Sequence, residues 1–371
     1  MKIAEIAAYD VRLDLVQPFV TALGRLDVLE TVIVRVADDH GNEGWGEAVP
    51  KPRIVGETSG SIRAALGLIA EKLRGEDPRR IDRTVRLMDE AIDRNTAAKA
   101  GVDIAIHDLL GKYWNEPLWR LLGGARCERL STDMTVGLQD VDSSVAQARA
   151  WVEKGFQTLK VKVGGAPHEE AQRVRAIRDA VGDDATIRLD ANQAWSVPEA
   201  IRALKLMTDC GVEFVEQPVP ALDIAGLKRV RQATDIPVMA DESVHGPEDA
   251  LRIVRESAAD YLNIKLTKSG GFFKARRIAA IADAAGLPCM VGGMFESDLA
   301  ATAAVHLAAA TGNVEFRDLD QGIVGLSLRE GIISEGGTHL DGNCRTVPMD
   351  AGLGVARLNE AVLGDPSARF A

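Results

Sequence analysis

The sequence predicts an α/β protein built on a parallel βα barrel. Eight apolar, β-branched segments recur between residues 131 and 320, and each ends in polar or charged residues and is followed by a helical pattern. A regular succession of near-continuous apolar strands and helices is typical of such a barrel. Equivalent positions near the ends of these segments lie 24 to 28 residues apart, the length of one strand plus one helix: Lys162, Asp190, Glu216, Asp241, Lys265, Gly293 and Asp318.

A doubly wound open sheet is the main competing architecture. It is disfavoured because the first strand carries no GxGxxG motif and because the repeat persists through all eight segments. In chain order the segments are STDMTVGL, FQTLKVKVGG, ATIRLDANQ, VEFVEQP, IPVMADES, YLNIKLTKSGG, LPCMVGGMFE and NVEFRDLD. In a barrel the active site lies where the strands end, so the charged residues at those ends are the candidates for chemistry.

The first third of the chain mixes strands and helices without a fixed repeat. The opening MKIAEIAAYDVRLDL alternates apolar and charged residues as a strand does. Residues 30–49 predict a hairpin with its turn at 38–42, and residues 60–75 and 97–115 predict helices. The LLGG at 121–124 indicates a helix end and a boundary before the barrel.

Composition restricts the classes of partner. The chain has 371 residues and a formal net charge of −11, so we expect neither nucleic acid nor a membrane surface as partner. No run approaches the roughly 18 apolar residues of a membrane span, and the start lacks the uninterrupted apolar stretch of a signal peptide. The four cysteines lie far apart without a CxxC pair. A reduced, cytoplasmic protein is therefore expected.

Two lysines stand two residues apart in the second strand of the series. In a strand, residues i and i+2 point to the same face, so Lys160 and Lys162 should project together while Leu159 and Val161 pack on the other side. The alternative is an edge strand with exposed lysines, which closure of the sheet and the apolar flanks disfavour. Two like charges in one enclosed place therefore indicate a functional site.

Strands three, four and five each end in an acid. Asp190, Glu216 and Asp241 should converge from neighbouring strands, where three carboxylates without a cation would repel one another. A hard divalent cation takes such oxygen ligands, so we expect one Mg²⁺, for which Mn²⁺ could substitute. Each acid alone could instead cap the following helix. Three in succession beside lysine-bearing strands favour the metal.

Lys265 ends strand six, and strands two and six lie half a circumference apart in a ring of eight. Lys162 and Lys265 should therefore face each other across the mouth. A substrate carboxylate on the metal would place its α-carbon between them, and a divalent cation with a nearby ammonium stabilises the enediolate that forms when the α-proton leaves. Lys160 is expected to hold that carboxylate and to ease deprotonation of Lys162. Two opposed lysines predict racemisation or epimerisation, and Lys265 could also pair with Asp241.

These residues resemble the enolase superfamily, in its muconate-lactonizing-enzyme subgroup. The subgroup's pattern stands in this chain as KVK, DAN, EQP, DES and NIK, in order and over essentially the full length. The resemblance implies a modified (β/α)7β TIM-like barrel at 126–340, covered by an α+β capping domain formed by 1–125 and a C-terminal return at 341–371. Within DAN, Asn192 is expected to support the metal ligands. Sites of this superfamily combine a metal with a lysine or histidine base, which agrees with the reasoning from the residues.

The DLD on strand eight resembles the mark of dipeptide epimerases, where two aspartates take the substrate's free ammonium group. Asp318 and Asp320 share a face by the period of two, opposite strand four, so a dipeptide would span from the metal to this pair. The segments are most similar to the L-Ala-D/L-Glu epimerase type. That type carries an arginine at the place of Gly24, and here Arg25 follows one residue later.

The preferred second residue of the dipeptide stays open at this point between an acidic, a hydrophobic and a cationic side chain. Arg25, Glu296 and Asp298 are the candidate side-chain contacts, and the two acids could instead hold their loop. A homo-oligomer is also expected. Cycloisomerase and N-acylamino-acid racemase activities on the same scaffold are the alternative reactions, and a non-catalytic binding protein is the alternative class. Neither muconate nor an N-acyl substrate has an ammonium group for the DLD pair.

Overall fold

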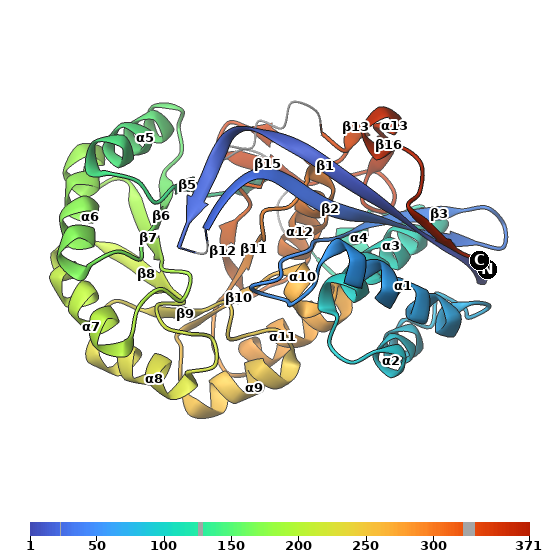
Figure 1. The fold of residues 1–371 in the computed structure, drawn as a ribbon, viewed down its shortest axis with the longest axis horizontal. Coiled ribbons are helices and arrows are strands. Elements are labelled where there is room, and N and C mark those ends of the chain that lie inside the picture. Colours follow the sequence, from blue (N-terminus) through green and yellow to red (C-terminus); the bar gives the residue numbers. More distant parts are fainter. Residues whose placement is uncertain (23, 125–128, 322–330) are drawn as a thin grey trace.

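The structure, a computed structural model, describes residues 1–22, 24–124, 129–321 and 331–371 and confirms the predicted α/β barrel with a second domain beside it (Figure 1). All eight predicted strands are present and pair in parallel, in the sheet order β12-β11-β10-β9-β8-β7-β6-β5. They are β5 Met134–Val136, β6 Thr158–Lys162, β7 Thr186–Asp190, β8 Val212–Glu216, β9 Val238–Ala240, β10 Tyr261–Ile264, β11 Cys289–Gly292 and β12 Val314–Asp318.

Helices follow the first seven strands and form the outer layer of the barrel (Figure 1). They begin with the signals expected of helix starts: Ser196 and Glu199 form a reciprocal capping box at one of them, with proline in its first turn. The helices are α5 Val141–Glu153, α6 Pro167–Val181, α7 Val197–Leu206, α8 Ile224–Ala233, α9 Pro247–Glu256, α11 Phe272–Ala284 and α12 Asp298–Ala310, with a short α10 Leu266–Ser269 and a 3₁₀ turn at Thr208–Cys210.

Strands β12 and β5 approach each other to close the barrel. The Leu319 N–H donates to Thr132 Oγ1 at 2.8 Å, and Arg317 Nε donates to the Ser131 carbonyl at 3.2 Å. Side-chain contacts thus join the last strand to the first. The β12–β5 seam brings residues that are nearly 190 positions apart in the chain into the same wall.

The inward-facing side chains form two layers, because alternate residues of a strand share a face. The lower layer is a plug of Phe214, Met239 and Met290, packed with Tyr261 and Phe316. The Arg188 guanidinium lies over the Phe214 and Phe316 rings, at 5.2 and 5.3 Å from their centres. Two positions further along the same strands the side chains become charged, as at Glu216, Asp241 and Asp318. The plug therefore closes the barrel beneath the charged site.

The second domain is a four-stranded antiparallel sheet with helices packed on it. Its strands, in the order β17-β1-β2-β3, are β1 Ile3–Thr21, β2 Gly24–Asp38, β3 Glu43–Ala48 and the C-terminal β17 Ala368–Phe370. Its helices are α1 Ser59–Leu73, α2 Ile81–Ala91, α3 Thr96–Trp114 and α4 Leu118–Leu121. The predicted hairpin and both predicted helices are confirmed. Both chain ends lie together on this domain, which we call the capping domain (Figure 1).

The β1–β2 hairpin and helix α3 both join the capping domain to the barrel. The long β1–β2 hairpin extends across the end of the barrel toward β5 (Figure 1), and the Leu138 N–H after β5 donates to the Val20 carbonyl at 3.2 Å. Helix α3 is buried from Ala97 to Gly111 without an exposed face, as expected of a helix packed on both sides. Its residues contribute to the cores of both domains.

The last part of the chain returns to the capping domain. Its elements are β13 Ile333–Gly336, β14 Leu340–Asp341, β15 Cys344–Thr346, β16 Val355–Leu358 and α13 Glu360–Leu363, with β14 and β15 forming a small sheet with β4 Arg129–Ser131. Strand β17 then pairs with β1, with Ile6 opposite Phe370. The predicted boundary between residues 125 and 126 lies outside the described residues. None of the helices in the described ranges combines the length and apolar character needed to cross a bilayer.

Helix α3 can approach the sheet closely because Gly101 faces it. A Cβ at Gly101 would lie 2.7 Å from Val34 Cγ2 and 3.0 Å from Ala48 Cβ. Gly101→Ala is therefore expected to lower the free energy of unfolding by about 1–3 kcal/mol through overpacking, although alanine is the better helix former by about 1 kcal/mol. Urea unfolding followed by circular dichroism measures the change.

Gly60 in α1 is the matched control, because a Cβ there would meet only Thr58 Oγ1 at 3.8 Å. Gly60→Ala should leave stability unchanged or raise it by up to about 1 kcal/mol. A Gly101→Ala protein as stable as the wild type would contradict the close approach of the helix to the sheet.

Candidate functional site

The predicted lysines and acids meet at the carboxyl ends of the barrel strands. Lys160 and Lys162 are on β6, which lies between β5 and β7 and so is not an edge strand. In register across the sheet, Lys162 stands beside Asp190, and Asp190 stands beside Glu216. Asp241 and Lys265 follow directly after β9 and β10. All of these side chains are buried.

Lys160 lies among three carboxylates. Its Nζ is 3.0 Å from Asp190 Oδ2, 2.9 Å from Glu216 Oε2 and 2.7 Å from Asp318 Oδ2. Burial alone would lower the pKa of Lys160, but the negative charges of these acids outweigh it and hold the pKa well above its usual value. Lys160 is therefore a permanent positive charge in the site.

Lys162 and Lys265 stand at the two ends of the row of acids. Lys162 Nζ is 2.6 Å from Asp190 Oδ2, and Lys265 Nζ is 2.8 Å from Asp241 Oδ2 and 3.8 Å from Glu216 Oε1. Their strands, β6 and β10, are four positions apart in the eight-stranded sheet. The two ammonium groups thus lie on opposite sides of the mouth.

The three acids differ in charge state. Burial would raise the pKa of Asp190, but Lys160 and Lys162 lower it below its usual range. Asp241 likewise has its pKa lowered, by Lys265 and Lys268, in spite of its burial. Burial and the neighbouring charge of Asp190 raise the pKa of Glu216 to about 7. The middle acid of the row is therefore the one that most readily takes up a proton, while Asp190 and Asp241 stay ionised.

Several residues that hold these acids were not predicted. Asn263 Nδ2 donates to Glu216 Oε1 at 2.6 Å. The fully buried Lys268 donates to the Asp241 carboxylate and to its carbonyl. The Gln217 side-chain oxygen accepts from the Asp241 N–H at 2.9 Å. Asn263 was recognisable from its place two residues before Lys265 on the same face, but no pattern distinguished Lys268.

One predicted metal ligand, Glu216, and three side chains near the row of acids have buried oxygens that a cation could satisfy. Among the described residues, buried oxygens without a hydrogen-bond partner gather around this row: Asn192 Oδ1, Glu216 Oε2, Glu242 Oε2 and Asn263 Oδ1. Such groups are costly unless a cation or water satisfies them. The backbone N–H of Asn192 donates to Asp190 Oδ1 at 3.0 Å and so orients that carboxylate. Asp190, Glu216 and Asp241 form a set of hard oxygen donors suited to Mg²⁺.

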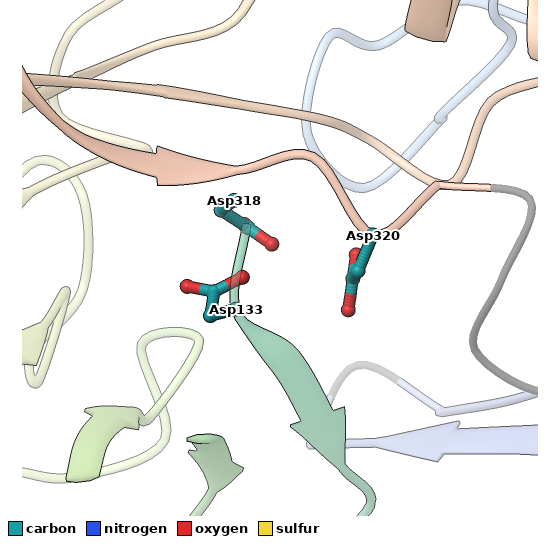
Figure 2. Close-up of side chains that lie close together, drawn as sticks. All are labelled: Asp133, Asp318 and Asp320. Carbon is teal, nitrogen blue, oxygen red and sulfur yellow. The ribbon is translucent and has the colours of Figure 1, made fainter. Parts of the chain in front are cut away.

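A second group of acids lies at the seam between β12 and β5. One oxygen each of Asp133, Asp318 and Asp320 lies within 4.8 Å of the others. Asp318 and Asp320 extend from the end of β12, and Asp133 lies opposite them at the start of β5 (Figure 2). The predicted ligands do not form such a tight group in the described part of the chain, because lysine ammonium groups lie between their carboxylates.

The members of this seam cluster have different partners. Asp320 accepts from Thr135 N at 3.1 Å and from Thr135 Oγ1 at 2.6 Å, and burial with the charge of Asp318 raises its pKa to about 6. Asp133 pairs with Arg188 at 2.9 Å. Asp318 and Asp320 line the cavity described next, whereas Asp133 is not among its lining residues.

A cavity of about 240 Å³ lies between the barrel mouth and the capping domain. The barrel lines it with the three site lysines Lys160, Lys162 and Lys265, with Asp241, and with Asp318 and Asp320. The capping domain lines it with the tip of the β1–β2 hairpin and with the segment after β3: Thr21, Gly24, Arg25, Leu26, Lys51, Pro52, Arg53 and Ile54. Three cations therefore face the barrel from the capping domain.

Of the three predicted contacts to the substrate side chain, only one lines the cavity. Arg25 lines the cavity, is largely exposed and pairs with Asp27 at 2.9 Å. Glu296 is buried against Thr267 Oγ1 at 3.0 Å, and burial with the charge of Glu47 raises its pKa to about 7. Asp298 accepts from the N–H groups of residues 332 and 333. Neither acid is among the residues that line the cavity.

The geometry agrees with the comparisons to known proteins. Residues 3–123 match the N-terminal domain of the mandelate racemase / muconate lactonizing enzyme family, and residues 143–361 match the enolase C-terminal domain-like family. The chain is 39% identical over 362 residues to the L-Ala-D/L-Glu epimerase of Clostridium acetobutylicum, covering 97% of this chain and 100% of the relative.

Two further relatives cover most of the chain. It is 35% identical over 310 residues to the N-succinyl-L-Arg/Lys racemase of Bacillus cereus, covering 83% of this chain and 84% of that protein. The solved structure of a dipeptide epimerase from Enterococcus faecalis, complexed with Mg and the dipeptide L-Leu-L-Tyr, superposes with a TM-score of 0.92 at 37% identity and covers 96% of this chain and 100% of that one. The chain therefore belongs to the enolase superfamily, in the branch of mandelate racemase and muconate lactonizing enzyme, as its five motifs predicted.

Proposed function

We propose that this protein is a Mg²⁺-dependent epimerase of dipeptides that inverts the α-carbon of the C-terminal residue. One observation carries the proposal: Lys162 and Lys265 lie on opposite sides of a row of three acids, and the acidic pair Asp318 and Asp320 lines the same cavity. The relatives named as dipeptide epimerases support it.

The acids and the lysines of the site would have different roles. Asp190, Glu216 and Asp241 would hold the Mg²⁺, with Mn²⁺ as a possible replacement, and the ion when bound stabilises negative charge on the substrate carboxylate. Lys160 is suited to bind that carboxylate because it stays charged. Lys162 and Lys265 would remove the α-proton from one face and return a proton to the other. These assignments stay proposals, as does the role of Asn192 in orienting Asp190.

The other end of the substrate would lie on Asp318 and Asp320. Both line the cavity on the β12 side, and a free ammonium group can donate to two carboxylates at once. An N-acylated substrate or a muconate offers no such donor. The pair therefore favours the dipeptide over the cycloisomerase and N-acylamino-acid racemase activities.

The capping domain favours an acidic side chain on the second residue. Arg25, Lys51 and Arg53 all line the cavity from that domain, and Glu296 does not reach it. Burial lowers the pKa of Lys51 to about 8, which leaves it mostly charged at neutral pH. We therefore propose an L-Ala-D/L-Glu type of substrate. The homo-oligomer and the cytoplasmic location expected from the sequence stay predictions.

Incubation with Mg²⁺ and L-Ala-L-Xaa dipeptides in deuterated water tests the proposal. Deuterium should enter the C-terminal α-carbon with inversion, measured by mass gain and chiral analysis. L-Ala-L-Glu should exceed its neutral match L-Ala-L-Gln in kcat/KM by at least about tenfold, since a charge-assisted contact contributes about 1.5–3 kcal/mol. If the metal-bound protein exchanges the α-proton of no dipeptide, the proposed epimerase activity is contradicted. Equal kcat/KM values for L-Ala-L-Glu and L-Ala-L-Gln would contradict only the proposed preference for an acidic second residue.

Each lysine is expected to serve one stereoisomer. Lys162→Ala and Lys265→Ala should each lower epimerisation by about 10²–10⁴-fold, because one of the two proton carriers is missing. Each variant should still exchange the α-proton of one diastereomer, and the two variants should retain opposite ones. Lys205→Ala, at an exposed position on α7, is the control. Loss of exchange from both diastereomers in both variants would exclude a division between the two lysines.

Acid should weaken substrate binding through Asp320. The ammonium group needs an ionised acceptor, and the pKa of Asp320 is raised to about 6, so affinity is present above that pH and is lost below it. The value of kcat/KM for L-Ala-L-Glu should fall about fivefold from pH 6 to pH 5 beyond any fall seen in Asp320→Asn, because the ionised fraction of Asp320 falls from about a half to about a tenth. Asp209→Asn, an exposed acid on the barrel's outer side, is the control and should keep the full fall. Identical profiles in the wild type and Asp320→Asn would contradict this role.

A further inference from the structure

Lys160 connects two anionic sites that have different tasks. Its Nζ contacts the proposed metal ligands Asp190 and Glu216 at 3.0 and 2.9 Å, and it contacts Asp318 of the proposed ammonium site at 2.7 Å. The residue is 2% exposed, so its charge cannot turn to solvent. A shift of the Lys160 ammonium group toward one of the two sites therefore moves it away from the other.

Asp318 is the anchor of Lys160. Of the three contacts within the described structure, only the one to Asp318 has the geometry of a hydrogen bond. Asp318 is itself buried at the end of β12, and the charge of Lys160 lowers its pKa in spite of that burial. A charge-assisted bond between buried partners is stronger than the same bond in water.

Asp320 has no such role, although it stands two residues away on the same side of the cavity. It is held by the backbone and hydroxyl of Thr135, and the ion pairs of Lys160 in the described chain do not include it. The two acids of the DLD motif are therefore not equivalent. Figure 2 shows Asp320 set apart from Asp318 along the chain that follows β12.

A divalent cation on Asp190 and Glu216 competes with the ammonium group that already contacts them. Two positive charges in a dry site repel strongly, and Lys160 can reduce that repulsion only by pairing with another acid. Apart from the metal ligands, Asp318 is the acid that pairs with Lys160 in the described structure. Without its charge, Lys160 would rely on the metal ligands alone.

We propose that Asp318 is a positioning residue for the metal site: by pairing with Lys160 it competes with Asp190 and Glu216 for the ammonium group, and so raises the affinity of those two carboxylates for Mg²⁺. This rests on the metal ligands of the proposed function. It gives Asp318 a task that does not depend on substrate. Removal of an acid that is not a metal ligand should therefore weaken metal binding.

Titration calorimetry with Mg²⁺ alone, without substrate, tests the proposal on the full chain. Asp318→Asn should raise the Kd for Mg²⁺ at least about tenfold, because Lys160 loses a charged hydrogen-bond partner. Asp320→Asn removes an equal charge nearby and should change the Kd by less than about twofold. Asp318→Glu keeps the charge and should restore most of the affinity. Asp318→Ser replaces the asparagine variant if circular dichroism shows that Asp318→Asn is unfolded.

A double-mutant cycle with Lys160→Met shows whether the effect passes through the lysine. In that background Asp318→Asn should change the Kd by less than about twofold. An undiminished tenfold effect, or equal losses in Asp318→Asn and Asp320→Asn, would overturn the proposal in favour of a general field effect. If the wild type binds no Mg²⁺, both the proposed assignment of the metal ligands and this inference are contradicted. Wild-type binding that Asp318→Asn leaves unchanged would overturn this inference alone.

Discussion

Charge buried at the carboxyl ends of the strands has to be balanced locally, because an unpaired ion out of water costs several kcal/mol. Lys160 meets this constraint with three acids, and Asp190 accepts both Lys160 and Lys162 on one oxygen. The balance depends on strand register. A slip of one residue would turn the charged side chains toward the helices and the apolar ones inward. A change in strand register would therefore disrupt the barrel, the plug and the site together.

The need to balance buried charge also explains a contact between the two domains. Glu47 of β3 accepts from the N–H groups of Ser297 and Ala300 at the start of α12, at 3.1 and 3.0 Å, and is fully buried. The N–H groups and the helix dipole favour negative charge on Glu47 and offset part of the effect of burial, which raises its pKa. The contact fixes the capping domain above the loop that follows β11, and this loop contributes Gly293, Met294 and Phe295 to the cavity.

Strand order and the residues at strand ends could be predicted because both follow from local periodicity. What the sequence did not indicate depends on distant parts of the chain. Asp133 meets Asp318 only because the barrel closes between β12 and β5. Lys268 reaches Asp241 from a four-residue helix that no periodicity distinguishes. Glu296 was expected near substrate, but Phe295 takes the cavity position with a φ of 65°, and Glu296 follows on the buried side.

The two domains differ in how freely their cavity residues can change. In the barrel, replacement of Lys160 or Asp190 unbalances a buried network and affects stability as well as chemistry. In the capping domain, Arg25 is exposed for 62% of its side chain and pairs only with the equally exposed Asp27 in the described structure, so its replacement has a small energetic cost. On the proposed function, recognition of the substrate side chain can therefore change while proton transfer is kept. Relatives at similar identity that act on different substrates are what this separation leads one to expect.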